Sequence, residues 1–350
     1  MDRIIRELLT SQTKIPQNPF QLQKLSGDAS TREYYRLKFD DGKSLIVMKI
    51  PAGLSSVSEE ITKTSKKINE LPFINVQKYL KSLGLPVPDT LAYSKNDGLL
   101  LLEDFGDVTL EKTVRDLPSA QRTGWYEKAL DLLALLQKNS RAAPPKDCIA
   151  AYRTFDADLL NWEFDHFLEY GIEDRLQIKV PATDKKKFAE LTRDITQKIV
   201  QMPQGFTHRD FQSRNLMVQN DSLRLIDFQD ALTGPLLYDL VALLRDSYVE
   251  LSPAEIAGLQ EYYAKKIDAG HSYHAKIKAI RNDFDLITIQ RKLKDAGRFQ
   301  YIKTVKKNDS FLKSVPASLR YVQKALGRQK DYAELTRLIA KYLPELREKT

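Results

Sequence analysis

Hydrophobic and polar residues alternate in short runs through the first third of the chain. Residues 20–25, 33–39 and 45–50 have the period of two that is typical of β-strands, and a turn signal at 40–42 separates the last two. Four consecutive leucines at 99–102 predict a further strand, buried on both faces. This part of the chain therefore predicts a small β-sheet.

Further along the chain, the apolar residues take the spacing of helices. Residues 73–83 and 125–136 each place their apolar side chains on one helical face, and the chain after Ser252 has a helical pattern rich in Lys, Tyr and Leu. We therefore predict an α+β fold with two lobes. A small antiparallel-sheet lobe at 1–104 precedes a larger, mainly helical lobe at 105–350.

A short polar motif in the second half predicts a phosphotransfer site. His208 and Asp210 are separated by one residue, and Asn215 follows Asp210 after four residues. This is the spacing of kinase catalytic loops, in which the Asp receives the proton of the attacking hydroxyl and the Asn holds a magnesium ion. We predict that Asp210 is the catalytic base and that His208 orients the loop.

The residues after this motif predict a hairpin that completes a metal site. Two strand-like runs at 216–219 and 223–226 are joined by the turn formers at 220–222. The hairpin folds Asp227 back beside Asn215. Together these two side chains offer the oxygen ligands that Mg²⁺ prefers, so we predict that they are the metal ligands.

Composition narrows the class of protein and its partners. The 350 residues are 42% hydrophobic and 29% charged, which is ordinary for a globular protein. The only cysteine, Cys148, excludes an internal disulfide, and the sequence predicts neither a secretory signal nor a membrane span, so we expect a cytoplasmic protein. The net charge of +8 is spread along the chain and predicts no nucleic-acid or membrane partner.

Several of these segments resemble one enzyme family. The motif from His208 to Asp227 is similar to that of the aminoglycoside phosphotransferase family, small-molecule kinases with a protein-kinase-like fold. The runs at 225–248 and 291–299, with GDASTREYYRL near the start, resemble the branch of bacterial anomeric kinases of N-acetylmuramate and N-acetylglucosamine. The resemblance covers about residues 22–321 and implies ATP and Mg²⁺ as cofactors.

The resemblance also implies which residues bind the nucleotide. The turn after the first strand would cover the phosphates through Gly27, Ser30, Thr31 and Arg32, although it has one glycine where protein kinases have three. Backbone groups at Glu103, Asp104 and Phe105 would bind the adenine base from a hinge between the lobes.

A lysine is expected to neutralise the phosphates from the third strand. Lys49 stands where the kinase fold places this residue, and the competing interpretation is an exposed strand lysine. Its carboxylate partner stays open among Glu59, Glu60 and Glu70.

Two further helical segments are candidates for the acceptor site. Glu163 and His166 share a helical face with aromatic neighbours, which suits either a platform for a sugar ring or simple packing. Arg291, Lys294 and Arg298 form one basic stripe, which would face either an anionic substrate or solvent.

Three functions agree with the sequence. The first is an ATP-dependent kinase of the anomeric hydroxyl of N-acetylmuramate or N-acetylglucosamine in cell-wall recycling. The second is a kinase of another small alcohol, such as an aminoglycoside, choline or an amino-acid alcohol, although a polycation suits a basic protein poorly. The third is a catalytically silent scaffold, which has no need to keep Asp210, Asn215 and Asp227 together.

Overall fold

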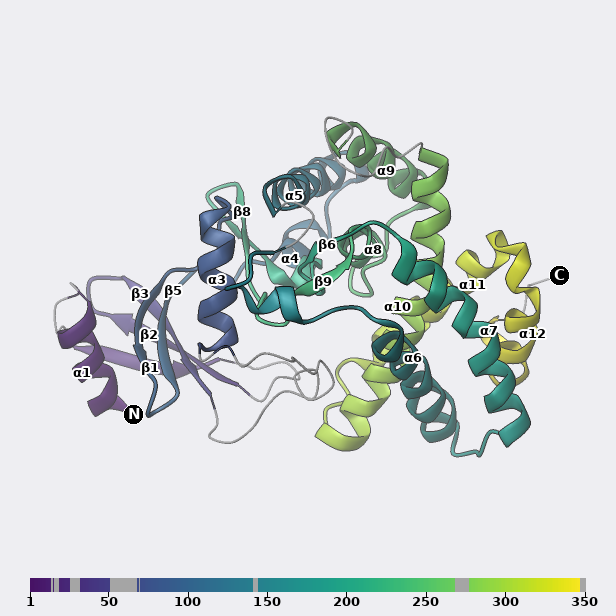
Figure 1. Cartoon of the computed structure of the whole chain (residues 1–350). Coiled ribbons are helices and arrows are strands. Elements are labelled where there is room, and N and C mark those ends of the chain that lie inside the picture. Colours follow the sequence, from purple (N-terminus) through teal and green to yellow (C-terminus); the bar gives the residue numbers. More distant parts are fainter. Residues whose placement is uncertain are drawn as a thin grey trace.

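A five-stranded antiparallel sheet forms one end of the molecule, and helices make up most of the remainder (Figure 1). The structure is a computed structural model that describes residues 1–13, 15, 19–25, 32–50, 68, 70–140, 144–267 and 277–346. The strand order is β1-β2-β3-β5-β4. Its strands are β1 (Phe20–Lys24), β2 (Glu33–Phe39), β3 (Ser44–Lys49), β4 (Thr90–Ser94) and β5 (Leu99–Glu103).

The sequence pattern found most of this sheet. Strands β1, β2, β3 and β5 lie within one residue of the predicted runs, whereas β4 was not predicted. Strand β4 is half-buried along most of its length. Its pattern therefore lacks the alternation of buried and exposed positions on which the prediction of the other strands depended.

Each face of the sheet is covered by one helix. Helix α1 (Asp2–Gln12) packs on the face that carries Val47, and α3 (Pro72–Ser82) packs on the face that carries Met48. Adjacent side chains of a strand point to opposite faces, so the leucine run 99–102 divides between the two cores. Burial on both faces explains why that run is continuously apolar.

The helical part is organised around the long helix α10, which packs against α6, α8 and α11. The end of α6 continues as a π-helical segment, Phe167–Asp174, that also packs on α10. The helices of this part are α4 (Leu110–Val114), α5 (Ser119–Ser140), α6 (Ala157–His166), α7 (Ala182–Gln201), α8 (Tyr238–Leu244), α9 (Pro253–Ile267), α10 (Ile277–Lys306), α11 (Val315–Arg328) and α12 (Ala333–Tyr342).

A glycine sets the close approach of α10 to the end of α6. A Cβ atom added at Gly297 would lie 2.8 Å from the Cα of Phe167 and 3.0 Å from the carbonyl oxygen of His166. Both are backbone atoms and neither can move without moving α6. Glycine at this position therefore fixes the two helices at a distance that no larger residue permits.

Two short antiparallel strand pairs lie at the centre of the molecule. Strand β6 (Gln204–Thr207) pairs with β9 (Leu232–Pro235), and β7 (Leu216–Gln219) pairs with β8 (Ser222–Leu225). The β7–β8 turn consists of two residues with φ values of 50° and 54°, which is the conformation that tight hairpins favour. The prediction placed Ser222 in this turn, but it pairs with Gln219 in the ladder.

These two strand pairs bring two loops together. One loop connects β6 to β7 and contains residues 208–215, and the other connects β8 to β9 and contains residues 226–231. The N–H of Ile226 donates to the carbonyl of Asn215 at 3.1 Å, so the loops run side by side. Among the described residues, no helix has the length and apolar character needed to cross a membrane.

Candidate active site

A cavity of about 850 Å³ lies between the sheet and the helical part. Its volume is within the roughly 300–1,000 Å³ that is usual for small-molecule sites. It is lined by most of the residues that the sequence singled out: Arg32, Glu103, Asp104, Phe105, Glu163, His166, Asp210, Asn215, Asp227, Arg291, Lys294 and Arg298. Gly27, Ser30 and Thr31 lie outside the described residues.

The loop that contains Asp210 is held by a buried carboxylate. Asp239, at the start of α8, accepts the backbone N–H groups of His208 and Arg209 at 2.7 and 2.9 Å. These bonds stabilise Arg209 at a φ of 77°, a conformation that costs free energy for a residue with a side chain. Burial raises the pKa of Asp239 to about 7 despite both hydrogen bonds.

His208 supports the same loop from inside. Its side chain is fully buried, its Nδ1 accepts the N–H of Asp210 at 3.3 Å, and its Nε2 lies 3.1 Å from the carbonyl oxygen of Ile226. Since Nδ1 accepts, the ring proton is on Nε2. Burial lowers the pKa of His208 to about 4, so the imidazole is neutral and orients the loop.

Asp210 lies beside a buried arginine of α10. The Nη2 of Arg291 is 3.4 Å from Oδ1 of Asp210, and its Nη1 donates to the carbonyl of Arg209 at 2.7 Å. Burial alone would raise the pKa of Asp210, but Arg291, Lys294 and Arg209 together hold it below its usual value. Asp210 is therefore ionised, and about a third of its side chain is exposed to the cavity.

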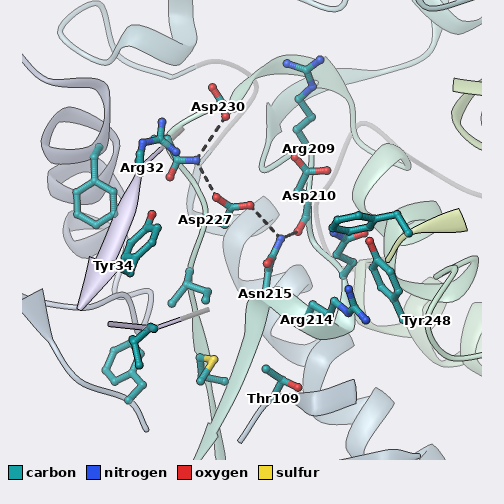
Figure 2. A pocket seen from close by; sticks show the side chains of 18 of the residues that line it. Arg32, Tyr34, Thr109, Arg209, Asp210, Arg214, Asn215, Asp227, Asp230 and Tyr248 are labelled. Carbon is teal, nitrogen blue, oxygen red and sulfur yellow. Dashed lines mark hydrogen bonds between the residues drawn. The ribbon is translucent and has the colours of Figure 1, made fainter. Parts of the chain in front are cut away.

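Asn215 and Asp227 meet as the hairpin predicts (Figure 2). The Nδ2 of Asn215 donates to Oδ2 of Asp227 at 3.3 Å and to the carbonyl of Asp210 at 2.9 Å. Gln229 donates from Nε2 to Asp227 at 2.8 Å and to Asp230 at 3.4 Å. Asp230, which the sequence analysis did not single out, lines the same cavity three residues after Asp227.

The electrostatics of this corner favour a cation. Burial, followed by the charge of Asp210, raises the pKa of Asp227 to about 6. Among the described residues, no group of three or more His, Cys, Asp or Glu side chains could hold a metal ion alone. Asp227 and Asn215 would thus supply two oxygens, which fits Mg²⁺, an ion that keeps several waters and binds substrate phosphates.

Lys49 does not line the cavity. It lies on β3 one residue after Met48, whose side chain faces the α3 core, so Lys49 points to the opposite face of the sheet. There its Nζ pairs with Oε2 of Glu33 at 3.1 Å, and 45% of its side chain is exposed. The structure therefore does not place Lys49 in the cavity where the phosphates were predicted to bind, because β3 turns its side chain to the face of the sheet that packs on α1.

The carboxylate expected to pair with Lys49 is also different. The neighbouring strand residue Glu33 takes this role, whereas Glu70 binds Lys78 and Asn75. Glu59 and Glu60 lie outside the described residues. Lys49 and Glu33 lie opposite each other on neighbouring strands, and the sequence alone did not reveal this register.

Arg32, which immediately precedes β2, lines the cavity together with the sheet residues Lys24 and Arg36. It lies beside Asp227 and Asp230 in Figure 2, and its charge acts to lower the pKa of Asp227. Arg32 was predicted at the end of the phosphate-covering turn, and it lines the cavity, whereas Lys49 does not. In the sequence, Arg32 can be recognised as the basic residue immediately before the predicted strand 33–39.

The segment after β5 is fixed by a salt-bridge network. Arg36 of β2 donates to both oxygens of Asp104 at 2.6 and 3.1 Å and to Asp107 at 2.6 Å. The side chain of Asp104 also accepts from Ser44 at 2.7 Å and from the N–H of Gly106 at 2.8 Å. The Asp104 carboxylate is therefore fully engaged in this network.

Glu163 is buried and paired, contrary to the idea that it meets a sugar. Its side chain is 1% exposed and accepts from Arg209 at 3.2 Å and from Gln290 at 2.6 Å. It thereby ties the catalytic loop to α6 and α10. Its role in the structure is to hold Arg209, because both carboxylate oxygens are already engaged.

His166 lies in an aromatic cluster that borders the cavity. Its ring centroid is 5.0 Å from that of Trp162, 4.7 Å from that of Tyr170 and 5.3 Å from that of Tyr301. Burial, with the charges of Arg298 and Lys294, lowers the pKa of His166 to about 4. The imidazole is therefore neutral.

The basic stripe on α10 faces the cavity and not solvent. Arg291 is fully buried, whereas Lys294 and Arg298 are partly exposed, and all three line the cavity. Lys294 pairs with Asp295 at 3.2 Å, and Arg298 lies 4.7 Å from the ring centroid of Tyr301.

A second buried carboxylate was missed by the sequence analysis. Asp246 accepts the N–H of Ser213 at 2.8 Å and its hydroxyl at 2.5 Å. These bonds fix the part of the loop that follows Asp210. Asp239 and Asp246 are seven residues apart and hold the two ends of one loop. The signal available in the sequence was that Asp246 follows closely after the apolar run 240–244.

Comparison with known proteins agrees with this geometry. The N-acetylmuramate/N-acetylglucosamine kinase of Pseudomonas aeruginosa is 29% identical over 341 residues, which cover 97% of this chain and 94% of that one. The kinase of the same name from Neisseria meningitidis serogroup B is 28% identical, covering 97% and 95%.

A solved structure shows the shared fold. Amicoumacin kinase hAmiN, in complex with AMP-PNP, Ca²⁺ and Ami, superimposes with a TM-score of 0.60 at 12% identity and covers 93% of each chain. The predicted α+β, protein-kinase-like fold is thus confirmed. A model of the phosphotransferase enzyme family matches residues 21–275, which is most of the chain. The chain belongs to the phosphotransferase enzyme family.

Proposed function

We propose that this protein is an ATP-dependent kinase that phosphorylates the anomeric hydroxyl of N-acetylmuramate or N-acetylglucosamine in cell-wall recycling. The observation that carries the proposal is the similarity to two N-acetylmuramate/N-acetylglucosamine kinases over 97% of the chain. That span includes α6 and α10, whose side chains line the part of the cavity around Asp210. The product is a sugar 1-phosphate.

Asp210 orients the acceptor hydroxyl and receives its proton. Cations around it keep its pKa low, so it is a weak base that takes the proton as the bond to phosphorus forms. Most of the acceleration then comes from the position of the hydroxyl in line with the γ-phosphorus, while proton acceptance adds on the order of 10²- to 10⁴-fold.

Asn215 and Asp227 hold Mg²⁺ in this proposal. When bound, the ion supplies neutralisation of the charge on the nucleotide phosphates. The chain contributes the negative charge of three neighbouring carboxylates, Asp210, Asp227 and Asp230, to the place where the cation would bind. The ADP-bound and AMP-PNP-bound relatives of this fold support a nucleotide and a divalent metal in the cavity.

The nucleotide binds on the sheet side of the cavity. Backbone groups of Glu103, Asp104 and Phe105 bind the base, and Arg32 pairs with the phosphates. Gly27, Ser30 and Thr31 complete the phosphate-covering turn. The division into two lobes at 104/105 is part of the proposal, and so is a cytoplasmic location, which gives access to ATP.

The alternatives have less support. An aminoglycoside or choline carries positive charge, whereas Arg291, Lys294 and Arg298 give the cavity a positive acceptor side. A silent scaffold has no use for Asp210, Asn215 and Asp227 in contact.

The proposal is tested by measuring ATP consumption with a panel of acceptors. N-acetylglucosamine and N-acetylmuramate with free anomeric hydroxyls should stimulate turnover, and their methyl glycosides should not. The phosphate should be released by mild acid, as expected for a sugar 1-phosphate. Phosphate on the C6 hydroxyl, or stimulation only by choline or an aminoglycoside, would contradict the proposal.

A further inference from the structure

The acceptor side of the cavity contains a guanidinium without an anionic partner. Arg298, on α10, lines the cavity and stacks on Tyr301 with 4.7 Å between its Cζ and the ring centroid. Within the described residues, the structure records no hydrogen bond or ion pair for this guanidinium. A partly buried charge without a partner is costly, so its presence indicates that a ligand supplies the anion.

Nearby acidic side chains do not fill this role, because each is paired with another cation. The pairs are Glu163 with Arg209, Asp210 with Arg291, and Asp295 with both Lys292 and Lys294. The remaining positive charges repel one another. Burial, then the charge of Arg298, lowers the pKa of Lys306. Burial lowers the pKa of Arg298 and the charge of Arg209 adds to this, whereas Tyr301, Asp210 and Glu163 act to raise it.

The position of Arg298 relative to the reacting group suits a substituted sugar ring. Arg298 is seven residues after Arg291, which is two helical turns or roughly 10 Å along the axis of α10. Since Arg291 contacts Asp210, Arg298 is about two helical turns along the same helix from the residue that contacts the proposed base. Trp162 and His166 line the same cavity with aromatic surface.

The packing of α10 fixes this arrangement. Gly297 precedes Arg298 and lets the helix backbone touch the His166–Phe167 turn. Arg298 is therefore held next to the aromatic cluster by backbone contact and not by a flexible side-chain pair. The fixed backbone and the stacking on Tyr301 restrain this side chain, which lowers the conformational entropy lost when it binds an anion.

We propose that Arg298 is a specificity-determining residue that binds the carboxylate of the acceptor, so that the enzyme prefers an amino sugar carrying a carboxylate over the same sugar without it. The inference rests on the proposed function. N-acetylmuramate and N-acetylglucosamine form the matched pair of probes, because they differ by a lactyl ether that carries the carboxylate. Arg291 does not take this role, because its guanidinium is engaged with Arg209 and Asp210.

The test compares both sugars in Arg298→Met, Arg298→Lys and the wild type. Lys303→Met is the control, because Lys303 is an exposed cation of the same helix and its loss changes the net charge equally. In Arg298→Met, the ratio of kcat/KM for N-acetylmuramate to that for N-acetylglucosamine should fall about 10- to 100-fold, the loss of one charge-assisted hydrogen bond. Arg298→Lys should fall less, and Lys303→Met should keep the wild-type ratio.

The other outcomes separate the possible errors. An unchanged ratio in Arg298→Met, with melting temperature preserved, would overturn the inference and leave the proposed function intact. A higher KM for ATP with an unchanged sugar ratio would assign the guanidinium to the nucleotide phosphates instead. If the wild type phosphorylates neither sugar, the proposed function fails and the inference fails with it.

Discussion

Replacement of Arg291 tests how the catalytic loop is held. Arg291 donates to the carbonyl of Arg209 at 2.7 Å, contacts Asp210 at 3.4 Å and stacks 4.9 Å from the ring of Tyr238. In Arg291→Met, the bond to the carbonyl should cost about 1 kcal/mol and the contact with the carboxylate about 1.5 kcal/mol. Loss of the stacking on Tyr238 adds about 0.5–2 kcal/mol.

The two consequences can be measured separately. Denaturant unfolding should show a loss of about 3–4.5 kcal/mol, and turnover should fall roughly tenfold or more because Asp210 loses the group that orients it. The KM for ATP should change little, since Arg291 lies on the acceptor side of the cavity. Lys303→Met serves again as the control for the loss of one positive charge from α10.

A double-mutant cycle with Asp210→Asn decides whether Arg291 acts through Asp210. The single replacement Asp210→Asn should lower turnover by about 10²-fold or more. If the arginine works by orienting this carboxylate, the double variant should lose little more than Asp210→Asn alone. Additive losses in turnover would refute the reasoning and give Arg291 an independent role.

Three other replacements test the site and its frame. Asp227→Ala should abolish Mg²⁺-dependent binding of ATP, measured by calorimetry with and without Mg²⁺, because Asn215 then offers one neutral oxygen to the ion. Equal ATP affinity in the wild type with and without Mg²⁺ would contradict the assignment. Gly297→Ala should lower the melting temperature by several degrees, since its Cβ would lie 2.8 Å from a backbone atom of α6, whereas the exposed helix position Gly258 should tolerate alanine. The pKa of His166 is lowered to about 4 in the folded chain, so the free energy of unfolding should fall as the pH decreases from about 6.5 to 4, by up to about 3 kcal/mol. His166→Gln should remove this part of the pH dependence, and an identical pH profile in both proteins would show that burial does not shift the group.

Local features of the sequence were sufficient for much of the fold. The strands β1, β2, β3 and β5 and the hairpin β7–β8 follow from alternation and turn residues, which act over a few neighbouring positions. The contact of Asn215 with Asp227 was predictable for the same reason, because one tight hairpin connects them. Half-buried β4 was missed, since its environment is set by distant elements.

The acceptor side was decided by the tertiary structure. The sequence predicted that α10 carries a basic stripe, but only the packing shows that Arg291 is engaged with the catalytic loop while Arg298 is not. Glu163 contacts Arg209 and Gln290 across 46 and 127 residues. Such pairs depend on how helices pack, which no local pattern encodes.

Lys49 shows the same limit within a single strand. The sequence by itself determined that a strand is present at this position, because β-propensity and alternation are properties of neighbouring residues. Which side chain faces the cleft depends on which face of the sheet packs on α3 and which on α1. A shift of one residue reverses the direction of every side chain, so tertiary packing turned Ile46 towards the cleft and Lys49 towards the outer face.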